Sequence, residues 1–149
     1  VMGGVITLAA YFVLSGQFTP MILYYALPLI ITIGLILMTN NGCDITKDIE
    51  ANRKTLPVLL GQKNTHRLLI FCFIFTILLC AHIGFWHFRY GSFIAAIMAV
   101  HAFFYLRPYV KTPLNLANRR FAMTTTLKLV KTINIYYLLM ILLGVLLHG

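Results

Sequence analysis

Two long runs without a charged residue constrain the fold of this chain most, because each is long enough to cross a lipid bilayer. They are residues 20–40 and 68–86, which contain no Asp, Glu, Lys or Arg. A membrane-spanning helix needs about 20 mostly apolar residues. The composition agrees, since 60% of the residues are hydrophobic, 10% are charged and the mean hydropathy is +0.89. Such values are typical of membrane proteins rather than of soluble domains.

The same criterion, applied along the whole chain, predicts an all-α fold: a multi-spanning transmembrane helical bundle of about five spans. The spans are expected near residues 2–15, 20–40, 67–87, 92–106 and 133–147, with a helix–loop connection over 41–66. The first run is short and the sequence begins with Val1 rather than with an initiating Met, so we expect a helix cut by the boundary of the sequence. The fourth run is marginal in length, and Tyr105 and Tyr109 would extend it into an aromatic belt.

Basic residues are distributed very unequally over the predicted connections, and this distribution predicts the orientation. Eleven of the twelve lie in or beside the second and fourth connections: Lys47, Arg53, Lys54, Lys63, Arg67, Arg107, Lys111, Arg119, Arg120, Lys128 and Lys131. The third connection has only Arg89. The positive-inside rule therefore places residues 41–66 in the cytoplasm. The net charge of +9 thus belongs to one membrane face, which attracts anionic lipids or an anionic substrate, and not to a nucleic-acid groove.

All three acidic residues of the chain lie in this second connection, as Asp44, Asp48 and Glu50. Counting in fours from Asn40 places Asp44 and Asp48 on the same face of a helix that continues the preceding span. Like charges at that spacing repel each other, so we expect a cation between them. Carboxylate and amide oxygens are ligands that Mg²⁺ prefers, and water and phosphate oxygens usually complete its shell.

Two basic residues, Arg53 and Lys54, follow the acids and suit the binding of a phosphate group. The combination favours a metal-chelated polyphosphate over a bare metal ion. The next segment predicts a short helix, with Thr55 as its N-terminal cap, Pro57 in its first turn and Gly61 at its exit. Its Leu-rich composition suits a position over the site, where it would exclude water.

Three other interpretations of this segment stay open. An acidic pair beside basic residues is often only a solvated surface, although here these are the chain's only acids. A non-catalytic or transporter-like bundle with an ion-binding loop is the second, but transporters typically place ionisable groups at mid-membrane, where this chain has no acid. An alcohol phosphotransferase also uses spaced aspartates, but its longer acidic pattern is missing.

The histidines in the apolar runs and the basic residues near the end of the chain are interpreted mainly as structural residues. His82 and His101 occur singly in apolar runs and are interpreted as buried helix-packing residues. The segment 111–131 is interpreted as an interfacial stretch held by anionic lipids, or alternatively as a basic rim that attracts a diphosphate. Lys128 and Lys131 are expected to snorkel from the inner end of the last span.

As a whole, residues 40–61 resemble the second aspartate motif of the UbiA-type intramembrane aromatic prenyltransferases, and most closely the 1,4-dihydroxy-2-naphthoate branch. That branch carries Asn-Asn-x-x-Asp-x-x-x-Asp, followed by a basic pair and Thr-Leu. The matching residues are Asn40, Asn41, Asp44, Asp48, Arg53, Lys54, Thr55 and Leu56. The resemblance implies a fold of nine membrane helices around a central cavity, of which this chain would form the last five.

The resemblance also implies a function: each of two aspartate motifs helps to hold Mg²⁺ and an isoprenoid diphosphate, whose prenyl group is transferred to an aromatic acceptor. Asp44 and Asp48 are then the expected catalytic metal ligands. The residues expected to bind the diphosphate are Asn40, Asn41, Arg53 and Lys54. The implied protein is an integral membrane enzyme of menaquinone or related quinone biosynthesis, in a bacterial cell membrane, with its motif in the cytoplasm.

The sequence departs from the family pattern in three respects. Ile49 stands where the branch often has Arg, and Asn52 stands where it has Gly. The first aspartate motif of the family is absent from the 149 residues of this sequence. We therefore expect an incomplete fragment that lacks the N-terminal half of the fold and is inactive alone.

Overall fold

A computed structural model describes residues 2–88 and 90–148, so Arg89, the one basic residue of the third connection, lies outside the described residues. Every regular element in the described ranges is helical, which confirms the predicted all-α fold. The helices are α1 (Met2–Ser15), α2 (Met21–Cys43), α3 (Ile45–Glu50), α4 (Leu56–Leu60), α5 (Gln62–His87), α6 (Gly91–Lys111) and α7 (Arg119–His148).

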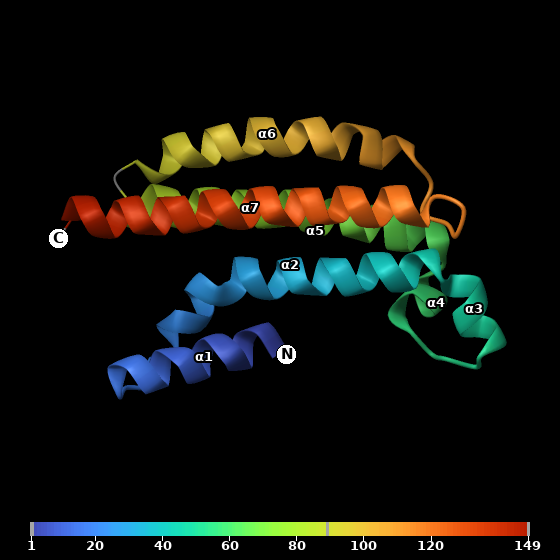
Figure 1. Cartoon of the computed structure of the whole chain (residues 1–149), viewed down its shortest axis with the longest axis horizontal. Helices are drawn as coiled ribbons and strands as arrows, with labels where there is room; N and C mark the ends of the chain where they lie inside the picture. Colours follow the sequence, from blue (N-terminus) through green and yellow to red (C-terminus); the bar gives the residue numbers. More distant parts are fainter. Residues whose placement is uncertain (1, 89, 149) are drawn as a thin grey trace.

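Four long helices, α2, α5, α6 and α7, lie side by side along the long axis of the molecule (Figure 1). Each of them is long and apolar enough to cross a membrane, whereas α1 is a shorter apolar helix that packs against α2. The short helices α3 and α4 lie together at the end of the bundle where α2 ends and α5 begins. The prediction of a multi-spanning helical bundle is therefore confirmed.

The core of the bundle is built from one face of each long helix. In α5, the buried residues Leu69, Phe73, Cys80 and Ile83 recur every three to seven positions, so they form a single stripe along one side of the helix. The opposite side of the same helix exposes large apolar side chains, for example Phe71. Extended exposed apolar surface of this type suits contact with lipid chains.

The last helix differs from its prediction. Instead of an interfacial stretch followed by a span over 133–147, residues 119–148 form one helix of 30 residues, about 45 Å long. The first turns of α7 remain in the bundle because Ala122, Thr126 and Leu129 are buried there. Residues 112–118, the first part of the predicted interfacial stretch, form an irregular connection between α6 and α7.

Three residues of the last two helices can be compared with their predictions. Lys128 and Lys131 lie within α7, and Lys128 Nζ is 5.8 Å from the ring centroid of Tyr105 on α6. That they snorkel from the inner end of the last span stays a prediction. His101 is exposed rather than buried, and its Nδ1 lies 3.3 Å from the hydroxyl oxygen of Tyr136 on α7. The packing interpretation of His82 is also wrong, since that side chain is exposed on α5.

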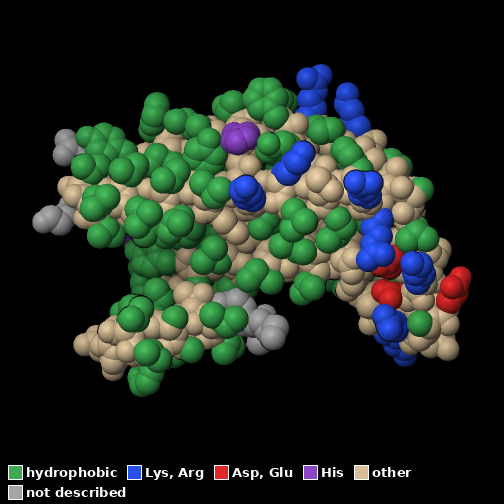
Figure 2. Space-filling view, in the orientation of Figure 1, with side chains coloured by type: hydrophobic (Ala, Val, Ile, Leu, Met, Phe, Trp, Pro, Cys, Tyr) green, Lys and Arg blue, Asp and Glu red, His purple; other side chains and the backbone are tan. Residues whose placement is uncertain are grey.

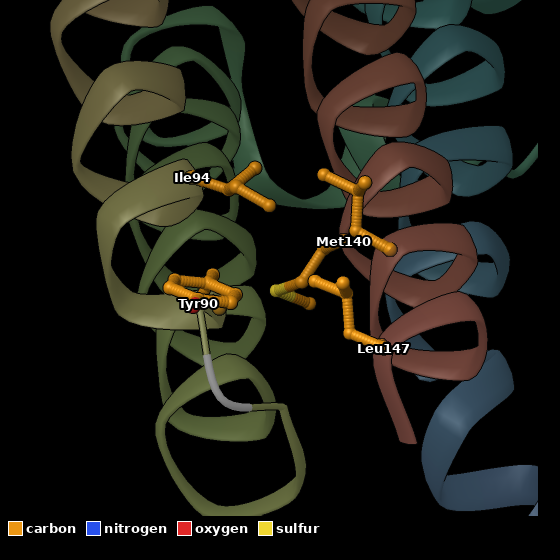
Figure 3. A pocket seen from close by; sticks show the side chains of 7 residues that line it. Tyr90, Ile94, Met140 and Leu147 are labelled. Atoms are coloured by element: carbon orange, nitrogen blue, oxygen red, sulfur yellow. The ribbon is translucent and has the colours of Figure 1, made fainter. Parts of the chain in front are cut away.

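At the end of the bundle away from α3 and α4, the helices α5, α6 and α7 approach one another very closely. Gly84 and Gly91 meet backbone to backbone, so a Cβ atom at Gly91 would overlap the Gly84 carbonyl group. Tyr90 and Ile94 face Met140 and Leu147 across the narrow seam between α6 and α7 (Figure 3). This seam has no space that would admit a water molecule, so the far end of the bundle is closely packed.

Candidate functional site

The two aspartates of the motif lie where α2 passes into α3. Asp44 ends α2 with φ −103° and ψ 16°, and α3 begins at the next residue. The helix is therefore bent at Asp44 and does not run straight through Asp48 as expected. The helical spacing survives the bend, because the Asp48 N–H donates to the Asp44 carbonyl oxygen at 3.0 Å.

Asp44 is held by a residue from the far end of the sequence. Arg119, the first residue of α7, places its Nη2 atom 3.2 Å from Asp44 Oδ2 and donates from the same nitrogen to Asn40 Oδ1 at 2.8 Å. The second carboxylate oxygen, Asp44 Oδ1, is buried and has no hydrogen-bond partner among the described residues. A buried acceptor without a partner is costly, so this oxygen is suited to receive a ligand.

Asp48 is surrounded by the segment that follows α3. The Thr55 hydroxyl donates to Asp48 Oδ2 at 3.1 Å, and Arg53 Nη1 lies 3.8 Å from Oδ1. Thr55 therefore bonds to the aspartate, whereas the sequence predicted that its side chain would cap α4. The Asp48 side chain is 9% exposed and that of Arg53 is 72% exposed, so the acid is fixed while its cationic partner faces solvent.

The turn that brings Arg53 back to Asp48 depends on Asn52. This residue has φ +53°, in the left-handed region, and the next N–H, that of Arg53, donates to the Asp48 carbonyl at 2.8 Å. Glycine and asparagine are the residues that adopt this conformation most readily. Asparagine at position 52 is therefore compatible with the conformation that this turn requires.

The remaining predicted residues lie near these groups without a comparable role. Asn41 is half-buried and its carbonyl oxygen accepts the Asp44 N–H at 3.2 Å. Lys54 and Glu50 are exposed. The structure thus forms one group of Asn40, Asp44 and Arg119 and another of Asp48, Arg53 and Thr55, and in the described ranges no ion pair or hydrogen bond between side chains joins the two.

The oxygen donors suit magnesium only if further ligands arrive with the substrate. No three His, Cys, Asp or Glu side chains cluster tightly enough to hold a metal ion, as far as the described residues show. Each aspartate nevertheless keeps one oxygen that is free or loosely paired, namely Oδ1 of Asp44 and Oδ1 of Asp48. Mg²⁺ is often bound through one or two carboxylates plus substrate phosphates, so these residues fit an ion that is chelated by a diphosphate.

A buried polar cluster supports the site from within the bundle. The Thr39 hydroxyl oxygen, one residue before Asn40, lies 3.1 Å from that of Thr126 on α7 and 3.4 Å from that of Tyr109 on α6. These contacts join three helices directly beneath the aspartates. They fix α7, and with it Arg119, relative to the end of α2.

The irregular connection between α6 and α7 covers one side of the same end. Leu114 packs against Gly42, where any Cβ atom would overlap its side chain, and the Gln62 amide donates to the Leu114 carbonyl oxygen. A hollow of about 370 Å³ remains between this connection, the α2–α3 bend and Gln62. In the space-filling view, Lys and Arg side chains surround the acids at this end of the molecule (Figure 2).

Sequence reasoning did not identify Arg119 as a partner of the aspartates. It assigned this residue to an interfacial stretch, because 75 residues separate it from Asp44 and no periodicity connects them. The only signal was its membership of the basic fourth connection, which the positive-inside rule places on the same membrane face as the motif.

Comparison with known proteins agrees with the motif and the fold. A model of the UbiA prenyltransferase family matches residues 1–131. The chain is also similar to 1,4-dihydroxy-2-naphthoate octaprenyltransferase of Bacillus subtilis (strain 168), with 34% identity over 68 residues, which cover 46% of this chain but only 22% of that protein. No solved structure matches. The matched family and the four membrane-length helices establish that this chain is an integral membrane protein belonging to the UbiA prenyltransferase family.

Proposed function

We propose that the protein containing this chain transfers a polyprenyl group from an isoprenoid diphosphate to an aromatic acceptor in menaquinone or related quinone biosynthesis. The observation that carries the proposal is a pair of aspartates at one end of a membrane bundle, each beside an arginine and each with an oxygen available. The name of the Bacillus relative supports the acceptor class. In this proposal the chain forms the last part of a nine-helix fold, and the preceding part supplies the other aspartate motif.

The motif is proposed to face the cytoplasm of a bacterial cell. Eleven of the twelve basic residues lie in or beside the connections that the motif end of the bundle contains, which is the distribution of a cytoplasmic face. That face then receives a water-soluble diphosphate head group while the prenyl chain stays among the apolar helices. The lipid bilayer is accordingly part of the substrate environment.

Asp44 and Asp48 are the proposed ligands of Mg²⁺, with Asn40, Asn41 and Lys54 beside the diphosphate. When bound, Mg²⁺ would neutralise negative charge on the leaving diphosphate. Residues of this chain also position a positively charged side chain at the site. Asp44 and Asn40 orient Arg119, whose side chain remains 41% exposed at the same end of the bundle.

Arg53 has a different role because its pairing is loose. Its nitrogen is 3.8 Å from the Asp48 oxygen and the side chain is largely exposed, so the ion pair contributes about 0–1 kcal/mol. A diphosphate can therefore attract Arg53 away from Asp48 at small cost. Releasing Asp48 Oδ1 in this way would free the second carboxylate oxygen at the moment when phosphate arrives.

The proposal is tested with the full-length protein in membranes, by measuring transfer of a labelled prenyl group from its diphosphate to 1,4-dihydroxy-2-naphthoate. Asp44→Asn and Asp48→Asn remove one carboxylate each without changing side-chain size. We expect each to lower kcat at least 100-fold, a loss typical of removing a group that stabilises developing charge. Glu50→Gln is the matched control, because Glu50 is an exposed acid on the same short helix, and its activity should remain within twofold of wild type.

Unchanged transfer in both aspartate variants would remove the assignment of the site. Loss of activity in Glu50→Gln to the same extent would show that negative charge of the loop, rather than these two carboxylates, is required. Absence of prenyl transfer by the wild-type protein with any aromatic acceptor would refute the proposed function itself.

A further inference from the structure

The contact between Arg119 and Asp44 uses only part of each group. Arg119 Nη2 lies 3.2 Å from Asp44 Oδ2 and also donates to Asn40 Oδ1 at 2.8 Å, so one nitrogen serves both partners. An arginine beside a carboxylate frequently makes two parallel bonds instead, from two nitrogens to the two oxygens. Within residues 2–88 and 90–148 the second bond is not made, because Asp44 Oδ1 is buried without a hydrogen-bond partner.

The unused part of Arg119 is a set of hydrogen-bond donors. A guanidinium group has N–H donors on Nε as well as on both terminal nitrogens. The contacts to Asn40 and Asp44 occupy Nη2, and no hydrogen bond or ion pair of Nε or Nη1 is found in the part of the chain that the structure describes. The side chain is 41% exposed, so these donors are accessible to a ligand.

Arg119 is held in place before any ligand arrives. Both of its acceptors lie at the end of α2, and the hydroxyl oxygens of Thr126 on α7 and Thr39 on α2 lie 3.1 Å apart behind it. Arg53 differs, since its nitrogen is 3.8 Å from the Asp48 oxygen and its side chain is 72% exposed. A preorganised donor loses little freedom on binding, so Arg119 suits a ligand that must be held in a defined position.

The charges at this contact favour an anion that arrives with a metal ion. The negative charge of Asp44 and the positive charge of Arg119 cancel in the structure. A divalent cation bound by Asp44 Oδ1, as in the proposed function, would leave the group positively charged. A diphosphate satisfies both unused parts, because its oxygens can bind the cation and also accept bonds from the free edge of the guanidinium.

We infer that Arg119 binds the diphosphate of the isoprenoid donor directly through Nε and Nη1, while Nη2 stays bonded to Asn40 and Asp44, an inference that rests on the proposed function. The first residue of the last helix is then a binding residue as well as a link between helices. Lysine would not replace it, because an ammonium group carries the charge on a single nitrogen and lacks the planar fork.

The test measures binding to the full-length protein in lipid nanodiscs, with Mg²⁺ present and no aromatic acceptor. The probes are radiolabelled geranylgeranyl thiodiphosphate, a poorly reactive analogue of the donor, and geranylgeraniol, which has the same prenyl chain but no phosphate. We expect Arg119→Gln to raise the Kd for the thiodiphosphate about 10- to 100-fold and to leave the Kd for geranylgeraniol unchanged, because only charge-assisted bonds are lost. Arg120→Gln, at the adjacent exposed arginine, is the matched control and should bind both probes as wild type does.

Two further variants separate direct binding from mere positioning of Asp44. Arg119→Lys should still raise the Kd for the thiodiphosphate about tenfold, because it keeps the charge but loses the fork. In the Asp44→Asn background, Arg119→Gln should weaken thiodiphosphate binding by about a further tenfold, since its own bonds to the ligand do not require the carboxylate. No further weakening in that background would show that Arg119 acts only through Asp44 and would overturn the inference.

Three other outcomes would overturn it as well. They are wild-type affinity for the thiodiphosphate in Arg119→Gln, wild-type affinity in Arg119→Lys, and equal weakening of both probes by Arg119→Gln. Because no turnover is measured, any of these results leaves the prenyl-transfer proposal standing. A protein that binds the thiodiphosphate as expected but transfers no prenyl group would refute that proposal and leave the binding role of Arg119 intact.

Discussion

At the scale of single residues, the site depends on one backbone conformation as much as on its charged groups. Asn52 at φ +53° reverses the chain after α3, and the reversal returns Arg53 and Thr55 to Asp48. Its side chain is exposed, so the identity of the residue matters through φ rather than through contacts. A residue that avoids the left-handed region would strain this turn.

We expect Asn52→Ala to lower the free energy of unfolding by about 1 kcal/mol, because alanine disfavours positive φ. Asn52→Gly is the matched control and should keep wild-type stability to within about 0.5 kcal/mol, since glycine adopts this conformation freely. Thermal unfolding of the full-length protein in detergent measures both changes. Equal stability of the alanine and glycine variants would show that the turn is not under conformational strain.

At the scale of elements, the bundle is held by close contact at one end and by polar contact at the other. Gly84 and Gly91 bring α5 and α6 together by backbone contact, far from the aspartates. Thr39, Tyr109 and Thr126 link α2, α6 and α7 beneath the motif. Small residues at helix interfaces and hydrogen bonds between helices are the usual means of association in membranes.

Gly91→Ala should therefore lower stability by about 1–3 kcal/mol, because its Cβ atom would meet the backbone of Gly84, which has no flexible end to move aside. Gly34→Ala in α2 is the control, since no atom lies within 4 Å of the added Cβ. The temperature of unfolding in detergent distinguishes them. If Gly34→Ala were as destabilising as Gly91→Ala, the loss would reflect glycine flexibility and not the helix contact.

At the scale of the whole molecule, Arg119 connects the start of the last helix to the motif. It bonds to both Asp44 and Asn40, so the position of α7 and the orientation of the first aspartate are coupled. The last helix of the chain thus contributes directly to the geometry of the aspartate site.

A double-mutant cycle between Arg119→Gln and Asp44→Asn tests this coupling. We expect Arg119→Gln alone to lower the free energy of unfolding by about 1–2 kcal/mol, and to cost much less when Asp44 is already neutral. Arg120→Gln, the adjacent and more exposed arginine, should have little effect in either background. Additive losses for Arg119 and Asp44 would show that the pair does not couple the two helices.

The sequence alone was sufficient to predict the class of fold, the family and the position of the motif. Uncharged runs report membrane spans directly, because the bilayer sets both their length and their composition. The segment from Asn40 to Leu56 preserved its spacing as a local pattern, and this carried the family resemblance that the match over residues 1–131 confirmed. The metal and diphosphate roles of its residues remain predictions.

The tertiary structure decided which residues share a site. It assigned Arg119 to Asp44, Thr55 to Asp48 instead of the α4 cap, and Lys128 to the ring of Tyr105 on α6. None of these follows from periodicity, because a helical pattern shows which face is apolar but not which neighbour that face meets. Composition shows where a membrane helix begins only when the ends of its apolar run are clear. The charges of the segment 111–131 indicated a surface stretch, but buried threonines and an alanine hold most of that segment in the bundle as part of α7.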